Sequence, residues 1–112
     1  MDTLIGVRMV DKIVMATVDL NGMLTGIGRA QIVEIIYIKD GKVEKISEID
    51  VKWDETHEKE QEGLHHASVA KFIIGNKVDE VVTAGAGPDM RSMLEKLGIK
   101  IRLANGYYKD YI

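Results

Sequence analysis

Two short stretches of the sequence carry polar side chains that suit ligand binding. Arg29 follows Gly28 on a glycine-containing loop, where a guanidinium can hold an anion through several N–H bonds. His65 and His66 are adjacent, and a neutral imidazole is a common metal ligand. Neighbouring residues on a helix point about 100° apart, so both histidines reach one ion only if another element helps. The alternatives are an arginine paired with a surface acid and a solvated pair of histidines.

A third candidate is the turn GAGPDM, which follows the β-branched stretch 78–84. Pro88 suits the first position of a helix, and Gly85 and Gly87 allow a sharp turn off the strand. The start of such a helix attracts anions. The stretch lacks the lysine and hydroxyl of a P-loop and the third glycine of a dinucleotide fingerprint. The sequence therefore predicts a strand-to-helix turn that either binds an anion or is simply a well-capped turn.

The elements that position these residues follow from hydrophobic patterns. Short β-branched stretches predict strands, and apolar residues at helical spacing predict two helices. Asp40 and Gly41 lie between two strand patterns and predict a tight hairpin. Gly98 predicts the end of the second helix. The expected strands are 12–18, 31–39, 43–53, 78–84 and 99–103, and the expected helices are 64–74 and 88–97. This order predicts a mixed α/β domain of three layers, with helices against a largely parallel sheet and an antiparallel hairpin.

The chain of 112 residues has the size of a single domain. We expect residues 1–11 to be an N-terminal extension, in which 4–10 form a short strand or an ordered arm. We expect residues 54–63 to be a mobile acidic loop, and residues 105–112 to be a tail that carries three tyrosines.

Composition limits the classes of function. The chain has no cysteine, which excludes disulfides, protein thiolate ligands and cysteine nucleophiles. The net charge of −3 disfavours nucleic acid as a partner, because phosphate binding needs a basic face. The sequence has neither an apolar stretch of spanning length nor a signal-peptide pattern, so we expect a cytoplasmic protein with no membrane partner.

The stretch VDEVVTAGAGPDMRSMLEKLGIKIRLA resembles the dinitrogenase iron–molybdenum cofactor biosynthesis family. A second block, KIVMATVD followed by GIGRAQIVEIIYI, is similar to the start of the same family's pattern. The likeness covers roughly residues 12–104. It implies a ribonuclease-H-like α/β/α motif with a five-stranded mixed sheet, in agreement with the order of the predicted elements.

The resemblance also implies carriage of a metal–sulfur cluster, such as an iron–molybdenum cofactor precursor, rather than catalysis. A cluster-donating or cluster-accepting protein would be the partner. His66 is the closer match to a family histidine near the helix start, with His65 one position away. Residues expected to hold the anionic cofactor are Gly28, Arg29, Gly85, Gly87 and Pro88.

Two departures keep other functions open. Gly26 and Ile27 stand where the family pattern often has histidine and phenylalanine. One alternative is therefore a relative that lost its ligand site and acts as a protein-interaction domain, with edge strands and tail tyrosines available for homo-oligomer formation. The other is a module that binds a nucleotide or a small anion at the glycine turn.

Overall fold

The computed structural model describes residues 10–55 and 62–112, with the side chains of residues 62–64 left aside. Its elements are the strands β1 (Lys12–Val18), β2 (Ile32–Lys39), β3 (Lys42–Asp50), β4 (Glu80–Thr83) and β5 (Lys100–Leu103), the helices α2 (Glu62–Gly75) and α3 (Pro88–Lys96), and the 3-10 helices η1 (Ile27–Arg29) and η2 (Tyr108–Tyr111). None of the helices within this described part is long and apolar enough to cross a membrane.

The sheet has five strands in the order β3-β2-β1-β4-β5. The strands β1, β2 and β3 pair antiparallel, whereas β1, β4 and β5 pair parallel. The hairpin between β2 and β3 turns at Asp40 and Gly41, whose φ values are 52° and 76°, as its two-residue loop requires. The predicted α/β fold with a five-stranded mixed sheet is therefore confirmed.

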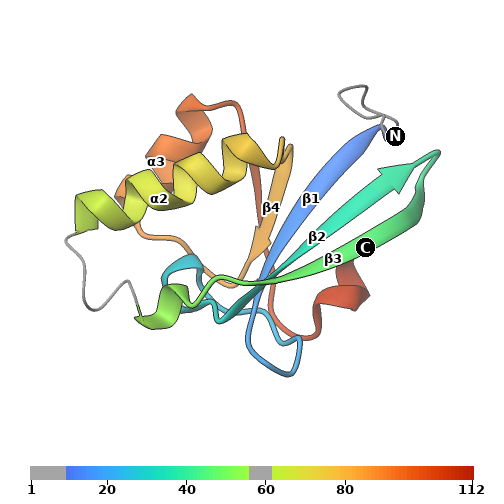
Figure 1. Cartoon of the computed structure of the whole chain (residues 1–112), viewed down its shortest axis with the longest axis horizontal. Helices are drawn as coiled ribbons and strands as arrows, with labels where there is room; N and C mark the ends of the chain where they lie inside the picture. Colours follow the sequence, from blue (N-terminus) through green and yellow to red (C-terminus); the bar gives the residue numbers. More distant parts are fainter. Residues whose placement is uncertain (1–9, 56–61) are drawn as a thin grey trace.

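Both α-helices cover the same face of the sheet (Figure 1). Alternate residues of a strand point to opposite faces, so Ile13 and Met15 of β1 face the helices. There they pack with side chains from α2 and α3, including Val69, Ile73 and Leu94. The main core thus lies between the sheet and the two helices, and it fixes where each helix begins relative to the strand ends.

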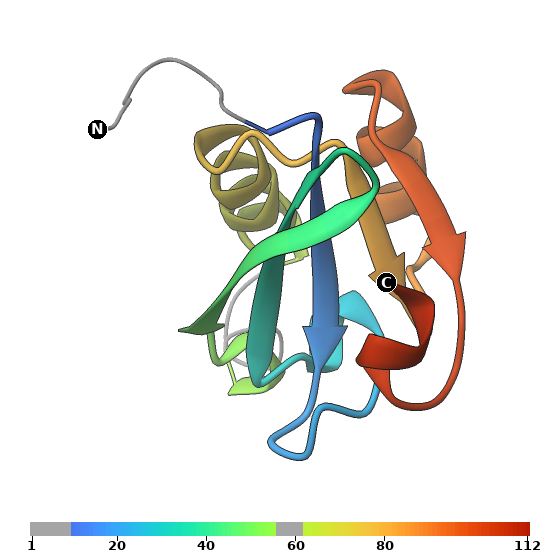
Figure 2. The ribbon, with the colours of Figure 1, turned by 90° about the vertical axis from the view of Figure 1, so that its right-hand side faces the viewer.

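The opposite face of the sheet is covered by the C-terminal segment, which is visible in front of the strands in Figure 2. Tyr108 is only 6% exposed and packs with Val14, Val18 and Leu24. The predicted tail is therefore a folded third layer, made by a 3-10 helix instead of an α-helix. Burial of its aromatic ring on the apolar sheet explains why this segment is ordered.

Residues after β3 depart from the predicted strand 43–53. The strand ends at Asp50, because Lys52 adopts a left-handed φ of 52°. Residues 53–55 are helical, and the ring of Trp53 packs edge-on against Phe72 of α2, with centroids 5.4 Å apart. The predicted mobile loop 54–63 therefore begins with two helical residues and ends within α2. Its centre, 56–61, and the predicted extension at 1–9 lie outside the described residues.

Candidate functional site

Two loops meet at the carboxyl ends of the parallel strands β1 and β4, which are neighbours in the sheet. Residues 19–31, here called the site loop, follow β1, and residues 84–87 follow β4. Gly26 and Gly85 form a bridge between the loops. The amide of Ile27 donates to the carbonyl oxygen of Gly85 at 3.0 Å, and the amide of Ala84 donates to that of Thr25, also at 3.0 Å. Ligands of open α/β sheets bind at such strand ends.

Two buried threonine side chains hold the two loops in place through hydrogen bonds. The Oγ1 atoms of Thr17 and Thr83 lie 2.8 Å apart, and they lie 2.8 and 2.9 Å from the carbonyl oxygen of Thr25. Both threonines are fully buried. Because buried hydroxyl groups must be hydrogen-bonded, this arrangement allows few alternatives and holds the loops in one position.

Gly26 occupies a close approach between the loops. A Cβ atom at this position would lie 3.3 Å from the carbonyl oxygen of Gly85, a tighter contact than side chains normally make. A histidine here would need the 84–87 loop to shift slightly. The glycine is therefore explained by the local packing of this chain.

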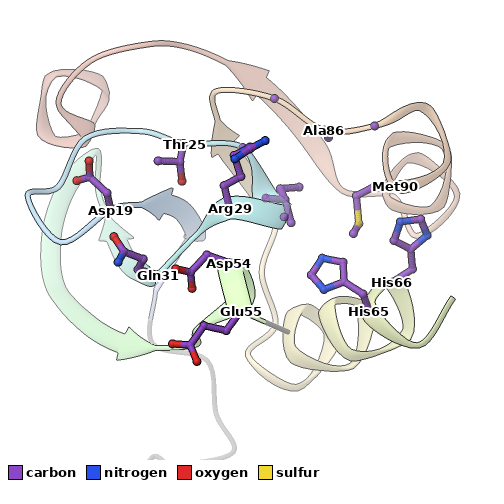
Figure 3. Close-up of a pocket in the computed structure, with 15 residues that line it drawn as sticks. Asp19, Thr25, Arg29, Gln31, Asp54, Glu55, His65, His66, Ala86 and Met90 are labelled. Carbon is purple, nitrogen blue, oxygen red and sulfur yellow. The ribbon is translucent and has the colours of Figure 1, made fainter. Parts of the chain in front are cut away.

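The loops, α2, α3 and residues 54–55 line an open cavity of about 720 Å³ (Figure 3). The histidines of α2 and Met90 of α3 lie on one side of it, and Arg29 and the acids of the other elements lie across from them. Of the residues predicted from the sequence, the structure brings six to this cavity and leaves Pro88 outside its lining, as the first residue of α3. The six are Gly28, Arg29, His65, His66, Gly85 and Gly87.

The two histidines differ in their surroundings. His65 is 1% exposed, and its ring stands edge-on to Trp53 with centroids 6.4 Å apart. His66 is half-buried, and its ring is tilted by 55° from that of His65 at a centroid distance of 6.1 Å. Both nevertheless reach the cavity, because it extends along the start of α2. Within the described ranges no three His, Asp or Glu side chains are grouped as a metal site.

The expected reason for Gly85 and Gly87 is wrong. Neither has a left-handed φ, and Gly87 adopts an ordinary extended conformation with φ −64° and ψ 162°. A Cβ atom at either position would meet no atom within 4 Å. Any small residue would therefore fit the turn. What glycine provides is a bare backbone at the wall of the cavity.

Sequence reasoning missed several residues of the cavity wall, which reach it only through the fold. Two of them hold the site loop: the Asp19 carboxylate accepts the amides of Asn21 and Met23, and Gln31 Oε1 accepts that of Leu20. Their position directly beside a strand end is the signal that would have found them. The missed residues include Asp19, Thr25, Gln31, Asp54, Glu55 and Met90.

Comparisons with known proteins agree with the fold. The family model described as dinitrogenase iron–molybdenum cofactor matches residues 9–110. The solved structure of PH0822 aligns with a TM-score of 0.69 at 19% identity, covering 88% of this chain and 82% of the other.

Two further solved structures align over similar lengths. A Methanocaldococcus jannaschii protein provisionally assigned as a dinitrogenase gives a TM-score of 0.64 at 17% identity, with 91% and 85% coverage. A Thermotoga protein provisionally assigned as NifB gives 0.63 at 16% identity, with 89% and 83% coverage. The comparison with curated proteins finds no match.

Proposed function

We propose that this chain, which belongs to the dinitrogenase iron–molybdenum cofactor family, binds an anionic metal–sulfur cluster or a cofactor precursor in the cavity and carries it without transforming it. Carriage implies a protein that donates the cluster and one that accepts it. We place this role in the cytoplasm.

The size of the cavity favours a bulky ligand over a single ion. Its volume of about 720 Å³ lies within the range of small-molecule and cofactor sites. The histidines lining it are not grouped with a third ligand, so the described side chains alone do not form a closed metal site. A cluster that brings its own sulfide ligands needs only one or two contacts from the protein, and imidazole and thioether groups suit such metals.

Positive groups on two sides of the cavity favour an anion. Arg29 is exposed at the end of η1 and lines the cavity. The first turn of α3 points its N-terminal dipole toward the same region, because Gly87 and Met90 both line it. A cysteine-free chain cannot supply thiolates, so positive charge and peptide N–H groups would add to the imidazole and thioether contacts in holding an anionic cluster.

The observation that carries the proposal is the pair of glycines on the wall. Gly85 and Gly87 line the cavity, yet neither their φ angles nor their contacts require glycine. Glycines that the fold does not need are explained if a ligand approaches the backbone closely, since any side chain there would occupy the ligand's space.

The test is anaerobic titration of the purified chain with isolated iron–molybdenum cofactor, followed by visible absorption and native mass spectrometry. We expect about one cofactor per chain. Arg29→Ala should raise the Kd about tenfold or more, because a hydrogen bond to a charged group contributes about 1.5–3 kcal/mol. Gly85→Ala should weaken binding comparably by filling the wall.

Gly75→Ala is the matched control for Gly85→Ala. Gly75 is exposed at the end of α2, and a Cβ atom there also meets nothing within 4 Å. It should bind cofactor like the wild type. Absence of binding by the wild type, or equal binding by all four proteins, would overturn the proposal. Thermal stabilisation by ATP or GTP in place of the cofactor would favour the nucleotide-binding alternative.

A protein-interaction role is the second candidate, and Gly26 is the observation that favours it. Gly26 stands on the cavity wall where the family pattern often has histidine, and its tight packing against the Gly85 carbonyl leaves little room for a side chain. A wild-type chain that binds no cofactor but co-purifies with a defined protein from its native host would support this function.

A further inference from the structure

The C-terminal segment 105–112 holds the first half of the site loop by main-chain hydrogen bonds. The amide of Leu24 donates to the carbonyl oxygen of Gly106 at 2.8 Å, and the amide of Tyr108 donates to that of Gly22 at 3.0 Å. Met23 and Tyr107 form a bridge between these two bonds. Figure 2 shows the segment alongside this loop, on the sheet face away from the α-helices.

The segment is in turn anchored on the sheet. The ring of Tyr108 is buried against Val14, Val18 and Leu24, on the sheet face away from the α-helices. Arg102 of β5 donates from Nη2 to the carbonyl oxygen of Tyr111 at 2.6 Å, and the Tyr111 hydroxyl donates to that of Asn105. A change in the sheet beneath Tyr108 is therefore transmitted to the segment, and through it to the site loop.

A pair of carboxyl groups lies on that part of the sheet. Glu34 of β2 is 5% exposed and stands directly opposite Glu48 of β3, to which its side chain is hydrogen-bonded. Two carboxylates cannot share a hydrogen bond unless one carries a proton. The other neighbours of Glu34 are the uncharged Ala16 on β1, and Lys109 and Tyr108 on the C-terminal segment.

We propose that residues 105–112 form a pH-sensitive latch on the site loop, whose hold is set by the proton shared between Glu34 and Glu48. With the proton in place, Glu34 is uncharged and compatible with its burial beside Tyr108. Without it, the seated segment would keep a negative charge away from water and opposite a second carboxylate, so a state in which water reaches Glu34 is favoured. Release of the latch then removes the main-chain support of residues 22–24, which lead directly into Thr25 and the cavity wall.

The electrostatics give the direction of the effect. Burial, followed by the hydrogen bond to Glu48 and its charge, raises the pKa of Glu34 from 4.5 to about 7, while Lys109 opposes the rise. The latched state therefore keeps a proton that a released, solvated Glu34 would give up. Release becomes easier as pH rises toward about 7, by up to about tenfold per pH unit, and is independent of pH above that value.

The same carboxylates act on the tyrosine above them. Burial first, and then the charges of Glu34, Tyr107 and Glu48, raise the pKa of Tyr108 to about 12. The Tyr108 hydroxyl therefore stays neutral across the window in which Glu34 titrates. A change in the latch between pH 5 and 7 is due to the carboxyl pair and not to the tyrosine.

The experiment is amide hydrogen exchange by NMR on the ligand-free chain, from pH 5 to 8, corrected for the intrinsic exchange rate. The reporters are the amides of Leu24 and Tyr108, and the amides of β1 report opening of the whole fold. We expect both reporters to be less protected than β1. Their protection should fall several-fold to about tenfold per unit below pH 7 and then level off.

Three variants should change the dependence of this protection on pH, here called the protection profile, in different ways. Glu34→Gln should make it flat, Glu48→Gln should move its midpoint below 7, and Lys109→Gln should move it above 7. Glu48 and Lys109 are exposed, so their variants keep the test valid even if Glu34→Gln fails to fold. Three results would each overturn the latch: protection independent of pH in the wild type, midpoints that do not move, or reporters that exchange only together with β1. None of these outcomes depends on whether a cofactor binds.

Discussion

Gly87→Asp should stabilise the chain and abolish binding of an anionic ligand. Gly87 is the residue before α3, and it already has the extended φ and ψ of an N-cap but no side chain to cap with. Aspartate is among the best N-cap residues, and its carboxylate would accept the amide hydrogens of the first turn. The same groups are those that we propose for the anion, and the new charge would repel it.

The stabilisation follows from three small contributions. A cap side chain in place of glycine contributes a few tenths of a kcal/mol. The loss of glycine's freedom in the unfolded chain contributes about 0.4–1 kcal/mol, because the native φ suits any residue. The helix dipole adds about 0.3–1 kcal/mol, less the repulsion from Asp89. We expect a net gain of about 1 kcal/mol, or roughly 4 °C in Tm for a domain of this size.

The assay is urea unfolding of the ligand-free variant beside the cofactor titration described above. Gly87→Ser is the matched neutral control: it should stabilise the chain by a similar amount and weaken binding less, because it adds a cap without a charge. A Gly87→Asp chain less stable than wild type would show that the fold does require this glycine. A stabilised chain that still binds cofactor normally would remove the start of α3 from the site.

Three further predictions concern the fold that supports the site. Thr83→Val keeps the shape of the side chain but removes one of the buried hydroxyls that contact the Thr25 carbonyl, and should lower the free energy of unfolding by about 1–3 kcal/mol in urea; an unchanged stability would contradict the role of the threonine pair. The folded chain keeps a proton on Glu34 that the unfolded chain releases. The free energy of unfolding of the wild type should therefore fall by up to about 1.4 kcal/mol per pH unit as pH rises from 4.5 to about 7. Urea unfolding at several pH values should show this loss in the wild type and not in Glu34→Gln. Lys77 has a left-handed φ of 57° just after α2, so Lys77→Gly should raise the free energy of unfolding by roughly 1 kcal/mol, and a destabilised variant would show that the lysine side chain matters more than the backbone strain.

The elements that local sequence determines were predictable. Asp40-Gly41 between two β-branched stretches predicts a two-residue hairpin, and both residues have the positive φ that this turn needs. Gly98 after an apolar helical pattern predicts a C-terminal cap. It has a φ of 78°, and the amide of Ile99 donates back to the carbonyl oxygen of Leu94 at 3.0 Å. In both cases a few adjacent residues contain all the necessary information.

Features that depend on distant residues were not predictable. The alternating pattern of β3 continues to Trp53, but the strand ends earlier because that indole packs against α2, which comes later in the chain. Residues 105–112, near the end of the chain, have no period of their own. They fold because β1 and β2 present an apolar face to Tyr108. Such outcomes come from tertiary packing, which overrides a local pattern.

The charged and polar groups of the cavity are not equally available to a ligand. Asp19 and Gln31 line the cavity, but their side chains are engaged by amides of the site loop, so they support the loop and offer little to a ligand. The cavity therefore presents Arg29 and the start of α3 to an anion, with Asp54 and Glu55 across from the histidines. An anionic cluster should sit toward the glycine wall and away from these two carboxylates. The bare backbone of Gly85 and Gly87 is what allows it that close an approach.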